Sequence, residues 1–212
     1  MTNGVIGPGD ALVRRPLLLL DVDGVLNVLA RDEADLKQWQ DWYGGHAESG
    51  GVWWPILWSP AVIDQLRDWH EHGLVELQWL TTWGHDSNGE LGKLLGLPTL
   101  QIAGTYEDDD ISGGVTATAG AAHASVAPSA PDPLTGQWWK YDVVRRVLEA
   151  EPDRRVIWVD DELYGHDNPF RAWADSQQLL IAVGPDPRRG LSPEDLELID
   201  RSLQSPAGRQ HS

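Results

Sequence analysis

The feature that most constrains the fold of this chain is the segment LLLLDVDGVLN at residues 17–27, in which four leucines lead directly into two aspartates and a glycine. An unbroken apolar run of this length is typical of a strand buried on both faces, as in a parallel sheet. We therefore predict a strand over residues 17–22 that ends at a turn beginning with Gly24. Asp21 and Asp23 would then emerge at the carboxyl end of a buried strand.

The same alternation continues along the chain, where short apolar runs are separated by segments with helical spacing of apolar residues. The predicted further strands cover residues 74–80, 99–103, 155–159 and 179–183, and the predicted helices cover 31–42, 60–73, 88–95, 139–150, 169–173 and 192–203. Strands that alternate with helices indicate a parallel sheet with helices on both faces. The predicted fold is thus a doubly wound, Rossmann-like α/β fold with five parallel strands and small inserts at its carboxyl edge.

One domain is predicted over residues 16–204, between a loose N-terminal tail (1–15) and a C-terminal tail (205–212). Two inserts interrupt this domain. Residues 28–58 combine charges and glycines with six aromatic residues and contain YGGHAESGG, which we predict to be a loop. The tryptophans of this insert either pack within it or stack on a ring-bearing ligand. Residues 107–137 are rich in Gly, Ala, Ser and Pro, a composition that predicts a flexible segment.

The overall charge restricts the partners that this chain can bind. Among its 212 residues, 16 are basic and 33 are acidic, which gives a formal net charge of −17. Such a charge repels polyanions and argues against sequence-independent coating of nucleic acid, although it still permits binding of one phosphorylated end. The chain has no cysteine, and its apolar runs are too short to span a membrane, so we expect a cytoplasmic protein without a membrane partner. The oligomeric state is left open.

Candidate chemical groups follow the ends of the predicted strands, the edge at which ligands bind in open α/β sheets. They are Asp21 and Asp23 after the first strand, Thr81 and Thr82 after the second, and Asp160 and Asp161 after the fourth, with Lys140 at the start of the preceding helix. Each residue taken alone is more often a turn, cap or surface residue. Together, crowded carboxylates beside one ammonium group favour a Mg²⁺ site that handles phosphate, because Mg²⁺ prefers oxygen ligands.

The segments LLLLDVDGVLN, WLTTW and VIWVDDE, together with Lys140, resemble the four motifs of the haloacid dehalogenase-like (HAD) phosphohydrolase superfamily in their usual order. The resemblance extends from residue 17 to about residue 203. In detail, WLTTW and WVDDE are similar to the HAD domains of bacterial RNA-repair-type multidomain proteins. By their positions, the two inserts correspond to the flap and the larger cap of this superfamily. The flexible composition of residues 107–137 predicts a site that is open to a large phosphorylated substrate.

The resemblance implies a Mg²⁺-dependent phosphatase that acts on a phosphorylated small molecule or a nucleic-acid end. It assigns Asp21 as the nucleophile that forms an aspartyl-phosphate and Asp23 as the general acid and base. Thr81, which fits the motif better than Thr82, would bind a phosphoryl oxygen, and Lys140 would neutralise charge. The implied Mg²⁺ ligands are Asp21, the backbone carbonyl of Asp23, Asp160 and Asp161.

Two alternatives stay open. A two-component receiver domain also places carboxylates, a threonine and a lysine around Mg²⁺, but there the acidic pair precedes the phosphorylated aspartate, which ends the third strand. A HAD-like domain that binds phosphate without turnover is the other alternative. His85, Asp86, Asn88 and His166 are read as loop or cap residues and are left outside the site. Asn27 either orients the turn or is an ordinary polar loop residue.

Overall fold

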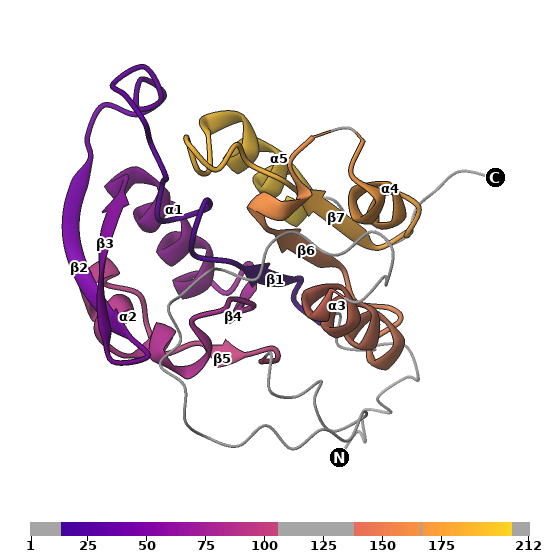
Figure 1. Ribbon diagram of the computed structural model, residues 1–212. Helices are drawn as coiled ribbons and strands as arrows, with labels where there is room; N and C mark the ends of the chain where they lie inside the picture. The colour runs from indigo at the N-terminus through magenta and orange to yellow at the C-terminus, as the bar shows by residue number, and fades with distance from the viewer. Residues whose placement is uncertain (1–13, 106–137, 166, 205–212) are drawn as a thin grey trace, which may run out of the picture.

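A computed structural model of the chain describes residues 14–105, 138–165 and 167–204 (Figure 1). The predicted insert at 107–137, the chain termini and His166 lie outside the described residues. The strands are β1 (Leu17–Leu20), β2 (Tyr43–Ser49), β3 (Val52–Trp58), β4 (Glu76–Trp79), β5 (Gln101–Ile102), β6 (Val156–Val159) and β7 (Leu180–Val183). The α-helices are α1 (Pro60–Glu71), α2 (Glu90–Leu95), α3 (Trp139–Ala150), α4 (Pro169–Asp175) and α5 (Pro193–Gln204), and two short 3₁₀ helices are η1 (Gly84–Asn88) and η3 (Asp161–Leu163). None of the described helices is long and apolar enough to cross a membrane.

The main sheet has five strands in the order β5-β4-β1-β6-β7, and every pair of neighbours is parallel. The chain adds β4 and then β5 on one side of β1, and adds β6 and then β7 on the other side. The strand order therefore reverses at β1, and this is the point where open α/β sheets bind ligands. The predicted doubly wound α/β fold is confirmed.

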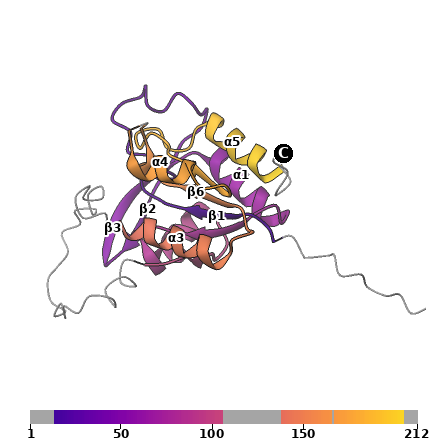
Figure 2. The ribbon, with the colours of Figure 1, turned by 90° about the vertical axis from the view of Figure 1, so that its right-hand side faces the viewer.

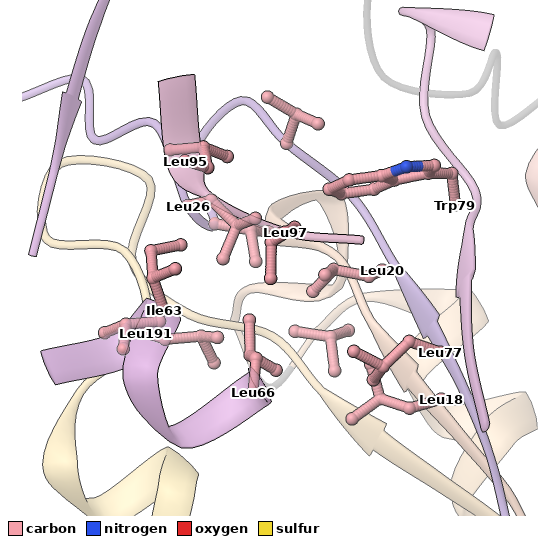
Figure 3. Close-up of a cluster of buried hydrophobic side chains, with 14 of the residues drawn as sticks. Leu18, Leu20, Leu26, Ile63, Leu66, Leu77, Trp79, Leu95, Leu97 and Leu191 are labelled. Carbon is pink, nitrogen blue, oxygen red and sulfur yellow. The ribbon is translucent and has the colours of Figure 1, made fainter. Parts of the chain in front are cut away.

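Side chains that alternate along the strands build two separate hydrophobic clusters. On one face, Leu18 and Leu20 of β1 pack with residues of α1, α2, α5 and the β2–β3 hairpin. Figure 3 shows part of this cluster, in which Leu66 and Ile63 of α1 lie near the sheet residues. On the other face, Leu17 and Leu19 pack with residues of α3 and α4. Figure 2 shows β1 between α3 on one side and α1 with α5 on the other.

The first insert contains a second sheet, so the predicted loop at YGGHAESGG is wrong. β2 and β3 form an antiparallel hairpin in which Tyr43 pairs with Trp58 and Ser49 pairs with Val52. The turn between the strands is Gly50-Gly51, and both glycines have positive φ, as a tight two-residue hairpin turn requires. A Gly-Gly pair before the aromatic run VWWPILW was the sequence signal for this hairpin. β2 contributes only Ala47 to the hydrophobic cluster, whereas β3 contributes Ile56 and Trp58, so most of the side chains that pack the hairpin come from β3.

The predicted helix over residues 31–42 is also wrong, because these residues form turns and bends. The reason is local: the Asp32 carboxylate accepts hydrogen bonds from the backbone N–H groups of Ala34 and Asp35. The Asp35 carboxylate in turn accepts one from the N–H of Arg31. Such side-chain contacts compete with the backbone pairing of a helix.

The other helices lie where the sequence predicts them, except that α2 begins at Glu90 and is preceded by η1. Side-chain caps mark the starts of two of these helices, α4 and α5. Asn168 accepts hydrogen bonds from the N–H groups of Phe170 and Arg171. Ser192 and Asp195 bond each other reciprocally, as in a capping box. Capping signals are local, and for this reason the sequence alone locates these helices well.

Candidate functional site

The site begins with two aspartates that follow neighbouring strands. Asp21 follows β1 and Asp160 follows β6, and β1 and β6 pair directly in the sheet. The ladder continues past the strands, since the N–H of Asp21 donates to the carbonyl of Val159 at 3.1 Å. Both side chains are buried, Asp21 being 5% exposed and Asp160 fully enclosed. The point where the strand order reverses therefore holds two buried carboxylates.

Lys140, in the first turn of α3, connects these two carboxylates. Its Nζ lies 2.5 Å from Asp21 Oδ2 and 2.8 Å from Asp160 Oδ2. The lysine is 3% exposed. Trp138, the residue before α3, packs against Trp158 of β6 with ring centroids 4.8 Å apart, so aromatic contacts hold the start of α3 over the sheet. One ammonium group thus bridges the carboxyl ends of β1 and β6.

Asp161 brings a third carboxylate to the same place. Carboxylate oxygens of Asp21, Asp160 and Asp161 all lie within 4.8 Å of one another, a spacing that can hold a metal ion. Gly24 makes this approach possible, because a Cβ at position 24 would lie 2.4 Å from Asp161 Cγ, and its φ is +70°. Oxygen donors in this arrangement match the preference of Mg²⁺.

The charges of the site are unbalanced. Burial raises the pKa of Asp160 well above its ordinary value. Burial, aided by the charge of Asp21, raises the pKa of Asp161 to about 7. Burial by itself would lower the pKa of Lys140, but the carboxylates of Asp160, Asp21 and Glu162 outweigh it and raise that pKa. One lysine therefore faces more negative charge than it can neutralise, and a divalent cation fits this donor set.

Asp23 has a different environment from Asp21. Its Oδ1 accepts a hydrogen bond from Asn27 Nδ2 at 2.7 Å, and its Oδ2 accepts one from Trp83 Nε1 at 2.8 Å. Burial raises the pKa of Asp23 although both hydrogen bonds lower it. The Asp23 side chain is not part of the three-carboxylate group found among the described residues. A partly buried carboxyl with a raised pKa is suited to proton transfer.

The two threonines after β4 differ in exposure. Thr81 is 1% exposed, and its Oγ1 accepts a hydrogen bond from the N–H of Trp83 at 3.4 Å. Thr82 is exposed to solvent. The N–H of Leu80, just before Thr81, donates to the carbonyl of Leu20, just before Asp21. This register places Thr81 beside Asp21, at the start of the loop that follows β1.

Two of the polar residues that the sequence left outside the site, Asp86 and Asn88, have roles in holding the fold. Asp86 accepts hydrogen bonds from Ser49 Oγ at 3.1 Å and from the N–H of Gly50 at 2.9 Å, so it holds the tip of the β2–β3 hairpin. The Asn88 side chain accepts hydrogen bonds from Trp79 Nε1 and from the N–H of Leu100, and it donates one to the Leu100 carbonyl. His85 is exposed. Asp86 and Asn88 thus stabilise the elements around the site.

Sequence reasoning missed two contributors, Glu162 and Trp83, and left the role of a third, Asn27, open. Glu162 Oε2 lies 4.0 Å from Lys140 Nζ, and burial raises the pKa of Glu162. Trp83 contacts Asp23 directly. Asn27 bonds Asp23 and also accepts from the N–H of Leu57 in β3 at 2.9 Å, so it orients the turn. The motif segments contain all three residues, but the sequence does not indicate which way their side chains face.

Among the tryptophans of the hairpin insert, Trp58 is buried and Trp54 packs partly against the larger cluster, together with Trp39 from the preceding turns. Trp53 is 57% exposed. Packing therefore accounts for most of the insert tryptophans, as one of the two sequence interpretations expected.

A parallel sheet with this order of strands, and with carboxylates and a lysine at the reversal point, defines a HAD-like domain. A family model described as the HAD domain in Swiss Army Knife RNA repair proteins matches residues 17–196. The chain belongs to this family, which confirms the resemblance stated from the sequence motifs and supports a phosphatase or hydrolase of the HAD type in general. No curated protein and no solved structure matches the chain.

Proposed function

We propose that this chain is a Mg²⁺-dependent phosphatase that acts through an aspartyl-phosphate on Asp21. The observation that carries the proposal is the contact of Lys140 Nζ with both Asp21 and Asp160, beside a third carboxylate from Asp161. Phosphoryl transfer needs positioning and neutralised charge more than any other contribution from the protein. This site offers a nucleophile, the fixed ammonium group of Lys140 and oxygen ligands for a metal ion.

In the first step, a carboxylate oxygen of Asp21 forms a bond to phosphorus while the bond from phosphorus to the leaving oxygen breaks. Asp23 in its protonated form gives its proton to that oxygen. The ammonium group of Lys140 neutralises the Asp21 carboxylate before attack and the phosphoryl oxygens during it. The raised pKa of Asp23 supports the role of acid.

In the second step, a water oxygen attacks phosphorus, the bond between phosphorus and Asp21 breaks, and the water proton passes to Asp23. Thr81, which follows β4, holds a phosphoryl oxygen in both steps. Asp21, the backbone carbonyl of Asp23, Asp160 and Asp161 would hold Mg²⁺. When bound, this ion supplies charge stabilisation for the transferring phosphoryl group.

The proposed substrate is the phosphorylated end of a nucleic acid. Membership in a family of HAD domains from RNA repair proteins supports this class of substrate. A net charge of −17 agrees with recognition of a single end rather than of a long stretch of backbone.

The experiment compares release of inorganic phosphate from 4-nitrophenyl phosphate, nucleotides and oligonucleotides phosphorylated at either end, with Mg²⁺ and with EDTA. We expect Mg²⁺-dependent turnover and a loss of at least about 10³-fold in Asp21→Asn. Asp153→Asn is the matched control. Asp153 is exposed in a turn before β6, so this variant should keep wild-type activity. No turnover by the wild-type protein on any substrate, or full activity of Asp21→Asn, would contradict the proposal.

A further inference from the structure

The side chain of Asp23 is held at both of its oxygens. Trp83 Nε1 donates to Oδ2 at 2.8 Å, and Asn27 Nδ2 donates to Oδ1 at 2.7 Å. Two donors on the two oxygens of one carboxyl group fix both its position and the rotation of its plane. A carboxyl on a loop after a strand would otherwise choose among several rotamers.

The two donors are themselves held in place. Trp83 is 6% exposed and belongs to the larger hydrophobic cluster. Asn27 is also 6% exposed, and its Oδ1 accepts from the N–H of Leu57 in β3. Trp83 follows β4 and Leu57 belongs to the hairpin, so two separate parts of the fold determine where Asp23 points.

We propose that Trp83 and Asn27 are positioning residues that aim the Asp23 carboxyl group at the leaving oxygen. The inference rests on the proposed phosphatase function. It goes further by assigning the efficiency of proton donation to two residues that act through the Asp23 carboxyl group and not on the substrate itself. Loss of either donor lets Asp23 rotate, so a correctly aimed proton is available for a smaller share of the time.

A role in aiming an acid has a signature that a purely structural role lacks. A leaving group that is a strong base needs a proton as its bond to phosphorus breaks, whereas 4-nitrophenolate needs almost none. The constant kcat/KM reports steps through the first bond cleavage, so it is unaffected by the later hydrolysis of the aspartyl-phosphate. Damage to the fold would lower kcat/KM equally for all leaving groups.

The test measures kcat/KM with Mg²⁺ for a series of substituted phenyl phosphates, from phenyl phosphate to 4-nitrophenyl phosphate. We expect Trp83→Phe, which keeps a ring but lacks the N–H, to lose about tenfold or more on phenyl phosphate and less than about threefold on 4-nitrophenyl phosphate. Asn27→Ala removes the donor to Asp23 without placing a second carboxyl group beside it, and it should show the same split. Asp23→Asn should show the split in its largest form.

Trp69→Phe is the matched control. Trp69 is 1% exposed, and its Nε1 also donates to an aspartate, Asp200 Oδ1, at 3.2 Å, but between α1 and α5. This variant should leave the dependence on the leaving group unchanged. Equal losses across the series in both Trp83→Phe and Asn27→Ala, or no loss in either, would overturn the inference. Absence of the split in Asp23→Asn would overturn it as well, because Asp23 would then not be the proton donor. No turnover by the wild-type protein would instead overturn the proposed function, and this inference with it.

Discussion

Gly24 sits where the loop after β1 approaches Asp161 in the loop after β6. Its φ is +70°, and a Cβ at this position would lie 2.4 Å from Asp161 Cγ, so there is no room for a side chain. We expect Gly24→Ala to displace Asp161 and to lower both kcat/KM and the affinity for Mg²⁺ by at least about tenfold. Gly50→Ala is the control, because it has a φ of +60° but meets no atom within 4 Å, so it bears only the backbone cost of about 1 kcal/mol.

Asp161 should make the stability of the metal-free protein depend on pH. Its pKa is raised to about 7, mainly by burial, from an ordinary value of 3.8. The folded protein therefore holds this proton more tightly than the unfolded chain, and stability is lost as the pH rises from about 4 to 7. In EDTA at pH 8, Asp161→Asn should unfold at a higher denaturant concentration than the wild type. Its free energy of unfolding should be larger by at most about 4 kcal/mol.

At pH 5 the difference between Asp161→Asn and wild type should be smaller, and saturating Mg²⁺ at pH 8 should favour the wild type because only it has the full ligand set. Chemical denaturation at the two pH values measures both comparisons. A difference that is the same at pH 5 and pH 8 would contradict the prediction.

At the scale of elements, side-chain hydrogen bonds from other parts of the chain hold the β2–β3 hairpin at both ends. Asn27 holds Leu57 near one end, and Asp86 holds Ser49 and Gly50 at the tip. We expect Asp86→Ala to increase the rate of amide hydrogen exchange in β2 and β3 about fivefold, since loss of these hydrogen bonds weakens the tip by about 1 kcal/mol. Asp64→Ala, which removes an exposed carboxylate on α1, should leave hairpin exchange unchanged. Unchanged exchange in Asp86→Ala would show that the tip needs no such support.

At the scale of the whole molecule, the net charge of −17 should oppose the approach of a long polyanion. We expect KM for a phosphorylated oligonucleotide to fall by about two- to fivefold as salt rises from about 20 to 200 mM, because salt screens this repulsion. KM for 4-nitrophenyl phosphate should change less. A rise of the oligonucleotide KM with salt would instead indicate release of counterions from a basic binding track.

The sequence predicted most of the fold because its signals are local. Four consecutive leucines can only be buried on both faces, and caps such as Asn168 and Ser192 locate helices within a few residues. Local signals failed in two segments, one where they competed with each other and one where the structure depends on a distant partner. In residues 31–42 the side chains of Asp32 and Asp35 bond the backbone in place of a helix. In YGGHAESGG the strand depends on a partner that the segment itself does not reveal.

By itself, the sequence determined the central strand, the class of fold and the residues that follow each strand, because burial and periodicity are properties of short segments. Only the tertiary structure decided which of those residues meet. Lys140 lies 119 positions from Asp21, and Trp83 lies 60 positions from Asp23. Contacts over such separations depend on strand order and helix placement, which no short segment encodes. The direction in which Asp23 points, and the residues that hold it there, are therefore properties of the folded chain.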